Sequence, residues 1–152
     1  MLRISKLTDY GIVLLGHFAR EEPGATRNAR EVAEETALPF PVVSKMLKTL
    51  AGAELLHSHR GAKGGYSLAK PPAAVSVAEI IEALEGPIAL MECTVGPGHC
   101  HQESSCGVSA PWQRINRAIQ ETLERVTLDE LVNAGSPGLL HVEDLTNAAP
   151  RA

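Results

Sequence analysis

The spacing of apolar residues in the first part of the chain predicts three short helices. Apolar side chains recur every three or four positions between residues 5 and 20, and Ser5 stands in front of them as a helix cap. Asn28 begins a second helix, because Glu31 follows it in the relation of a capping box. A third helix is expected over residues 41–50. The apolar face of the first helix comprises Leu7, Val13, Leu14, Leu15 and Phe18, and that of the third comprises Val43, Met46, Leu47 and Leu50.

A β-hairpin is predicted directly after the third helix. Residues 55–60 and 66–69 read as strands, and a glycine-rich turn over residues 61–65 separates them. Two short helices joined by a tight turn and followed by a hairpin are typical of a winged helix-turn-helix, so we expect this part of the chain to bind double-stranded DNA. Base-edge contacts are expected from Ser44 and Lys45, and backbone or minor-groove contacts from Arg3, Lys6, Lys48, Arg60 and Lys63. A solvated hairpin tip that only keeps the sheet edge soluble is the alternative.

Two further helices are predicted beyond the double proline at residues 71 and 72. Ser76 caps the first of them in another capping box, and Gly86 ends it. From about Ser109 a long helix carries an apolar stripe that no second large helix of this chain covers, so the same helix of a second subunit is its expected partner. Packing on the first and fourth helices of the same chain is the alternative. The residues expected at the dimer contact are Trp112, Ile115, Ile119 and Leu123.

These elements predict a mainly α fold with a small β-hairpin wing, in four parts. Residues 1–70 form the winged helix-turn-helix domain, and residues 71–108 form a linking helix and a cysteine-rich loop. Residues 109–133 form the dimerisation helix and a short terminal helix, which a capping box at Thr127 opens. Residues 134–152 are a tail rich in Gly, Pro, Asn and Ala, whose end is expected to be disordered.

All three cysteines of the chain, Cys93, Cys100 and Cys106, lie within fourteen residues of glycine-rich, polar sequence. A structural free cysteine is usually a small buried hydrophobe, so metal ligation explains this loop better. The separations do not fit the short Cys-x(2–4)-Cys spacing of tetrahedral zinc sites, whereas iron–sulfur clusters are larger and accept wider spacing. The loop therefore favours a cluster, with zinc or one disulfide as the alternatives.

Charge and composition restrict the function further. The net charge is −4, but residues 1–70 carry ten Lys and Arg against seven Asp and Glu, so the basic residues gather in the predicted DNA-binding part. No apolar run approaches eighteen residues and no signal peptide is evident, which predicts a cytoplasmic protein without a membrane partner. No Cys–His pair with a third orienting residue is evident, so we expect neither an enzyme nor a small-molecule substrate. His17, His57, His59 and His141 are interpreted as structural or surface residues.

Four segments in this order resemble the Rrf2 family of winged-helix transcription regulators, which includes the regulators called IscR and NsrR. They are the opening MLRISKLTDYG, the wing RGAKGGYSL from Arg60, SVAEII from Ser76 and TLDELV from Thr127. The resemblance extends to about residue 133. Its nearest branch is the regulator of the SUF system of iron–sulfur cluster assembly. It implies a homodimeric repressor whose DNA binding changes with occupancy of a 2Fe–2S or 4Fe–4S cluster.

The resemblance also implies ligands. It assigns the cluster to the three cysteines, but the fourth ligand stays open. IscR-like members use a histidine three residues after the last cysteine, where this chain has Ser109, and NsrR-like members use an aspartate of the opposite subunit that matches Asp9. His99 and His101 are the rivals. A zinc-stabilised regulator, or one that responds to nitric oxide or redox state, is the alternative function with the same architecture, and a cysteine-dependent enzyme is a remote one.

Overall fold

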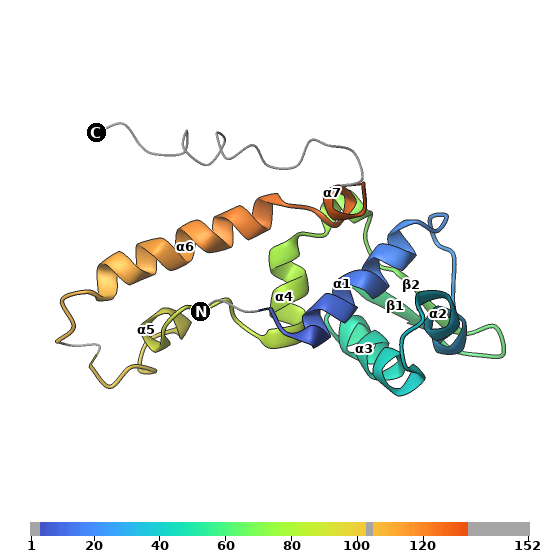
Figure 1. The fold of residues 1–152 in the computed structure, drawn as a ribbon, viewed down its shortest axis with the longest axis horizontal. Coiled ribbons are helices and arrows are strands. Elements are labelled where there is room, and N and C mark those ends of the chain that lie inside the picture. The colour runs from blue at the N-terminus through green and yellow to red at the C-terminus, as the bar shows by residue number, and fades with distance from the viewer. Residues whose placement is uncertain (1–3, 103–104, 134–152) are drawn as a thin grey trace.

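The computed structural model describes residues 4–102 and 105–133, and in this part of the chain it confirms a mainly helical fold with one antiparallel hairpin (Figure 1). The described elements are α1 (Lys6–Ala19), α2 (Ala29–Thr36), α3 (Phe40–Gly52), β1 (Leu56–His59), β2 (Gly65–Leu68), the 3-10 turn η1 (Pro72–Ala74), α4 (Val77–Glu85), α5 (Glu92–Val95), α6 (Ser109–Arg125) and α7 (Leu128–Asn133). No helix in these ranges is both long and apolar enough to cross a membrane. The predicted tail and Arg3 lie outside the described residues.

One hydrophobic core joins α1, α2, α3, α4 and the hairpin. Its fully buried side chains include Leu14, Leu47 and Ile80, and the predicted core face of α3 is buried throughout. The helices start where the sequence predicts: Ser5, Asn28 and Ser76 each accept a hydrogen bond from the first turn of the helix that they cap. Local capping and apolar spacing therefore agree, which is why this unit was predictable.

The buried stripe of α1 differs from the predicted one. Leu7 and Val13 are 45% and 44% exposed, whereas the small residues Thr8 and Gly11 are buried. The reason is close packing against α4: a Cβ added at Gly11 would lie in the space of the Leu84 side chain. Small residues on this face let α4 approach α1, and the larger apolar residues turn outward.

The short helix α7 returns to the core instead of extending α6. Leu128 is fully buried, its N–H donates to the carbonyl of Val75 at 2.8 Å, and the N–H of Val77 donates to the carbonyl of Val126 at 2.9 Å. The prediction grouped α7 with the dimerisation helix, but in the structure α7 packs against α1 and η1. The C-terminal end of α6 is thereby tied to the start of α4.

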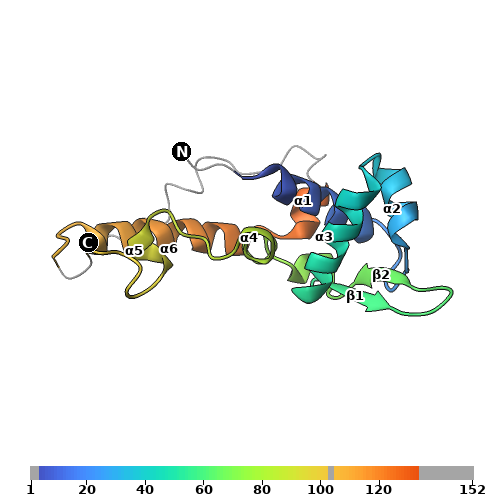
Figure 2. The same ribbon diagram turned by 90° about the horizontal axis from the view of Figure 1, so that it is seen from below.

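Helix α6 projects from this unit, with α5 beside its far end and the hairpin at the opposite end of the molecule (Figures 1 and 2). Helix α6 packs against α4 and α5. Asn116 is its one buried residue, and the apolar side chain of Ile115 is 46% exposed. The helix is therefore long, amphipathic and largely uncovered within one protomer.

Candidate metal centre and nucleic-acid interface

The three cysteines lie on the segment that connects α4 to α6. Cys93 is in α5, a short helix that the sequence analysis did not predict, and Cys106 comes shortly before α6. Thr94 closes the turn at Cys93: its hydroxyl donates to the Met91 carbonyl at 2.7 Å and accepts from the Met91 N–H at 3.2 Å. This hydroxyl–backbone pairing gives α5 a local cause that apolar spacing alone does not reveal.

None of the cysteines forms a disulfide, and all three thiols are half-buried. Gly98 between Cys93 and Cys100 has a positive φ of 82°, a left-handed conformation that glycine adopts without strain and that reverses the loop. Among the described residues, the three cysteine sulfurs do not all lie within 4.8 Å of one another. The ligand atoms of His17, Glu21 and Glu35 do. Because the thiolates of a tetrahedral zinc ion lie only about 3.8 Å apart, the loop would have to contract to hold zinc.

Asn116 of α6 fixes the start of the cysteine loop. Its side chain is 5% exposed, its Oδ1 accepts from the Leu90 N–H at 3.0 Å, and its Nδ2 donates to the Ile88 carbonyl at 3.0 Å. This amide therefore replaces the secondary-structure partners that residues 88–90 lack and holds Cys93 close to α6. Sequence reasoning missed Asn116; a polar residue inside an apolar helical stripe was the available signal.

A hollow of about 320 Å³ separates the turn at Cys93 from α6. Cys93 lies on one wall, and the opposite wall is formed by Gln113, Asn116, Arg117 and Gln120 of α6. Arg117 gives this polar wall one formal positive charge, and Cys93 lines the same hollow. Such surroundings suit an anionic, thiolate-ligated group better than an apolar substrate.

Asp9 and the loop histidines are accessible as predicted ligands. Asp9 is exposed on the first turn of α1, and His99 and His101 are exposed on the cysteine loop. The carboxylate of Glu85, at the end of α4, accepts hydrogen bonds from the Thr8 hydroxyl and from the Ser5 N–H, the latter at 2.9 Å. These two hydrogen bonds, that of Thr8 first, hold the pKa of Glu85 below its usual value of 4.5. The turn of α1 that carries Asp9 is therefore tied to the helix that leads into the loop.

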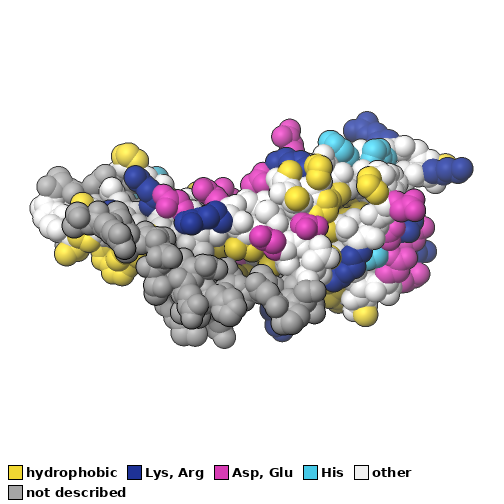
Figure 3. Space-filling view, turned by 90° about the horizontal axis from the view of Figure 1, so that it is seen from above, with side chains coloured by type: hydrophobic (Ala, Val, Ile, Leu, Met, Phe, Trp, Pro, Cys, Tyr) yellow, Lys and Arg dark blue, Asp and Glu magenta, His cyan; other side chains and the backbone are white. Residues whose placement is uncertain are grey.

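The predicted DNA-contacting residues that the structure describes lie in α1, in α3 and in the turn of the hairpin. Helices α2 and α3 are joined by a tight turn in which Ala37 is left-handed (φ 54°), and Lys45 and Lys48 are exposed on α3 with Ser44 half-buried beside them. Lys6, Arg60 and Lys63 are also exposed. In Figure 3, Lys and Arg side chains project at the right-hand end of the molecule, where Figure 1 places the hairpin.

The wing is built on backbone contacts that need glycine. Its strands pair in the register Leu56–Leu68 to His59–Gly65, and Tyr66 exchanges two further hydrogen bonds with Arg27, at 2.8 and 3.0 Å. A Cβ at Gly65 would come within 2.4 Å of the Arg27 carbonyl oxygen. The Lys70 ammonium then pairs with Glu79 of α4 at 2.6 Å, which lowers the pKa of Glu79. These contacts fix the direction of the wing relative to α4.

A helix-turn-helix with a wing, a buried core and a cysteine-bearing extension defines a DNA-binding transcriptional regulator. The model of the Rrf2 family, described as iron-dependent transcriptional regulators, matches residues 4–134, so the chain belongs to this family. The HTH-type regulator CymR of Bacillus subtilis is 29% identical over 87% of this chain and 91% of its own length. NsrR of Oceanobacillus iheyensis is 28% identical over 86% of this chain and 90% of its own length.

Solved structures give the same result for the fold. The structure of B. subtilis CymR, described as the global cysteine regulator, superposes with a TM-score of 0.69 at 29% identity and covers 88% of this chain and 98% of that one. The structure of T. potens IscR has a TM-score of 0.65 at 24% identity, with 92% and 93% coverage, and supports the fold alone. The family resemblance, the winged-helix fold and the expectation that the protein is not an enzyme are thus confirmed.

Proposed function

We propose that this regulator binds an iron–sulfur cluster through Cys93, Cys100 and Cys106, and that occupancy of this site controls repression of SUF-type cluster-assembly genes. The observation that carries the proposal is the cysteine loop itself. It places three unpaired thiols on a segment that is anchored to the uncovered helix α6, in a member of an iron-dependent regulator family.

The donor set fits a cluster. Cys93, Cys100 and Cys106 are half-buried, and two glycines between Cys93 and Cys100 let that segment bend around a multi-iron group. The positive charge of Arg117, which lines the same hollow as Cys93, would offset the negative charge of a thiolate-ligated group. The cluster would supply sensitivity to iron supply and to oxidants. The chain's own residues hold the loop in place, and Asn116 does so through two backbone hydrogen bonds.

A second protomer is needed to complete this arrangement. The stripe of α6, with Ile115 exposed and Trp112, Ile119 and Leu123 half-buried, is the proposed dimer contact. In such a dimer the exposed Asp9 of one protomer is the proposed fourth ligand for the thiols of its partner. His99 and His101 are its competitors, because imidazole also binds iron.

The route from the loop to DNA runs through α4. Glu85 ties the end of α4 to the first turn of α1, and Leu84 packs on Gly11. Binding at the loop would hold α1 of one protomer against α6 of the other. The two helix-turn-helix units would then present α3 and the wing to successive major grooves with a fixed spacing, and loss of the ligand would release that spacing.

The test is anaerobic purification of the wild type and of Cys106→Ser, Asp9→Ala and Arg114→Ala, with the visible spectrum and the iron, sulfide and zinc contents measured on each sample. The expected result is a brown wild type with iron and sulfide, a colourless Cys106→Ser protein, a less stable spectrum for Asp9→Ala and an unchanged Arg114→Ala control. A wild type that contains zinc alone would refute the cluster. Binding to a SUF-operon promoter fragment, tighter for the cluster-bound form, tests the target genes.

A second candidate is a regulator of the same architecture that is stabilised by zinc or responds to nitric oxide or redox state; the similar protein CymR is described as a cysteine regulator. The same samples distinguish the two. Zinc bound one-to-one, or thiols that oxidise reversibly without iron or sulfide, would support this second function.

The wing has its own test. Lys63 is exposed at the hairpin tip, and we expect Lys63→Ala to weaken binding to all DNA sequences and to flatten the salt dependence of binding. Glu54→Ala, at an exposed position outside the wing, is the control for a nonspecific change. An unchanged salt slope for Lys63→Ala would contradict the assignment of the wing to a phosphate contact.

A further inference from the structure

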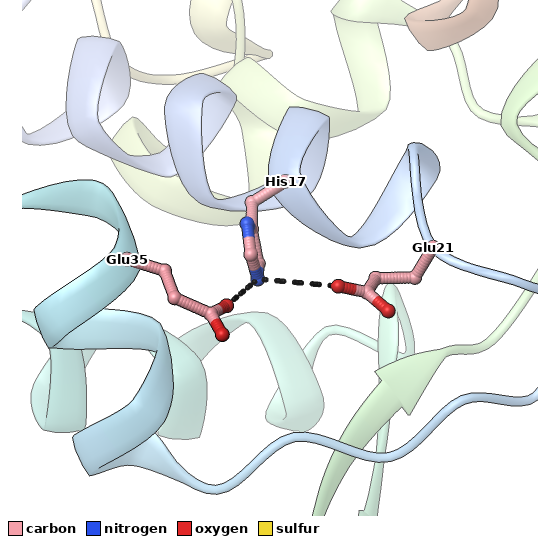
Figure 4. Close-up of side chains that lie close together, drawn as sticks. All are labelled: His17, Glu21 and Glu35. Atoms are coloured by element: carbon pink, nitrogen blue, oxygen red, sulfur yellow. Dashed lines mark ion pairs between the residues drawn. The ribbon is translucent and has the colours of Figure 1, made fainter.

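Three potential metal ligands lie close together where the end of α1 contacts α2. His17 is in the last turn of α1, Glu21 follows one turn later, and Glu35 is near the end of α2 (Figure 4). His17 Nε2 lies 3.0 Å from Glu35 Oε2 and 3.9 Å from Glu21 Oε1, and one ligand atom of each residue lies within 4.8 Å of those of the other two. The two glutamates and the histidine thus point at one place from three separate segments.

The imidazole nitrogen at the centre of this group has no hydrogen bond. Its atom is buried, and although the Glu35 carboxylate is only 3.0 Å away, the contact lacks hydrogen-bond geometry. The two carboxylates that face this nitrogen satisfy it only as ion pairs of a protonated ring; a neutral ring needs a cation between them. A neutral imidazole has a lone pair on one ring nitrogen, which can bind a cation placed between the two carboxylates.

The charges around the group are compatible with a dication. Arg27 Nη2 pairs with Glu21 Oε2 at 2.7 Å and leaves Glu21 Oε1 directed at His17. Arg27 therefore acts as an outer partner that orients a ligand carboxylate, as is common around metal sites. With neutral His17, the two glutamates and Arg27 leave a net charge of about −1 near the proposed ion.

We propose that His17, Glu21 and Glu35 bind a divalent first-row metal ion, with water as the remaining ligand. Ligands about 2.1 Å from a tetrahedral ion lie about 3.4 Å apart, and the observed 3.0 and 3.9 Å separations lie on either side of this value. The side chain of Glu35 is 47% exposed, so solvent reaches the open side of the site. Imidazole and carboxylate donors select Zn²⁺, Fe²⁺ or Mn²⁺, in contrast to the soft thiolates of the cysteine loop.

Such an ion would link α1 to α2, the first helix of the helix-turn-helix. Helix α2 packs against α3, so the ion would stiffen the element that carries the expected base contacts. The site is separate from the cysteine loop and needs no cluster. Its occupant would report metal supply directly to the DNA-reading unit.

Titration of the full-length protein with Mn²⁺, followed by loss of the free-ion electron paramagnetic resonance signal, tests this site. Mn²⁺ is chosen because its preference for oxygen and nitrogen ligands keeps it off the cysteine loop. The wild type is expected to bind one Mn²⁺ per chain and to gain melting temperature, because the ion binds the folded state. Glu35→Gln and His17→Gln are expected to weaken binding by at least about tenfold and to abolish the thermal gain.

The matched control is Glu34→Gln, which removes an exposed carboxylate of the same helix next to the proposed ligand. Circular dichroism of each variant establishes that it is folded before the titration. Equal Mn²⁺ affinity in wild type and Glu35→Gln would overturn the proposal. So would a wild type that neither binds the ion nor gains melting temperature, since the group would then be an ion pair of protonated His17 with two carboxylates.

Discussion

Replacing Asn116 with alanine should destabilise the protein and loosen the cysteine loop. The substitution removes the acceptor of the Leu90 N–H and the donor to the Ile88 carbonyl, both at 3.0 Å, from a side chain that is 5% exposed. Each buried polar group left without a partner costs about 1–3 kcal/mol. Ile88 is buried whereas Leu90 is half-buried and can regain a hydrogen bond from water, so we expect a loss of about 2–4 kcal/mol.

Thermal unfolding at one fixed protein concentration measures this effect. A loss of that size lowers the melting temperature of a chain of this length by about 5–15 °C. Arg114→Ala, at an exposed position of the same helix, should melt like the wild type. Asn116→Asp separates the two hydrogen bonds, because a carboxylate still accepts from Leu90 but repels the Ile88 carbonyl; it should be at least as unstable as Asn116→Ala. If Asn116→Ala melts within one or two degrees of Arg114→Ala, the amide does not anchor the loop.

Three further predictions concern the helices around this anchor. Gly11→Ala should be less stable than Gly16→Ala by about 1 kcal/mol in chemical denaturation, because its Cβ would displace the end of the Leu84 side chain whereas that at Gly16 meets an ordinary contact; equal stabilities would contradict the packing of α1 on α4. Glu85 has a lowered pKa in the folded state, so its contribution to the free energy of unfolding should be complete above pH about 4.5 and lost as pH falls through the lower folded-state value. The Glu85→Gln protein should therefore lose stability less steeply in acid denaturation, and an unchanged profile would argue against the α1–α4 hydrogen bonds. Ile115→Glu places a charge on the exposed stripe of α6 and should yield a folded monomer in analytical ultracentrifugation, whereas an unaffected dimer would place the contact elsewhere.

Most of the helices and the wing were predictable from the sequence because their signals are local. Ser5, Asn28, Ser76 and Thr127 cap their helices as expected, and the apolar spacing of α3 gives its buried face. Capping residues and periodic apolar positions act within one or two turns, so no tertiary information is required to find them. The glycines of the wing are likewise visible in the sequence, although the Arg27 backbone that requires Gly65 is not.

The remaining features depend on contacts between distant residues. The return of α7 to α1, the outward position of Leu7 and the anchoring role of Asn116 each follow from a partner more than twenty positions away or from a neighbouring helix. His17 shows the same limit. In the sequence it is one histidine among six without a neighbouring motif, and only the approach of α2 brings Glu35 to its ring.

Helix α4 contacts both the winged helix-turn-helix and the helix that carries the cysteine loop. At its start, Glu79 pairs with Lys70 at the end of the wing; at its end, Glu85 holds the first turn of α1, directly before the chain enters the cysteine loop. It also packs against α3 and α6. A displacement of the loop that moves α4 must therefore strain at least one of these polar contacts, while a displacement that leaves α4 in place cannot reach the wing by this route. Coupling through α4 consequently predicts that Glu85→Gln and Lys70→Ala reduce the difference in DNA affinity between the loaded and empty protein, and an unchanged difference in both variants would contradict this route.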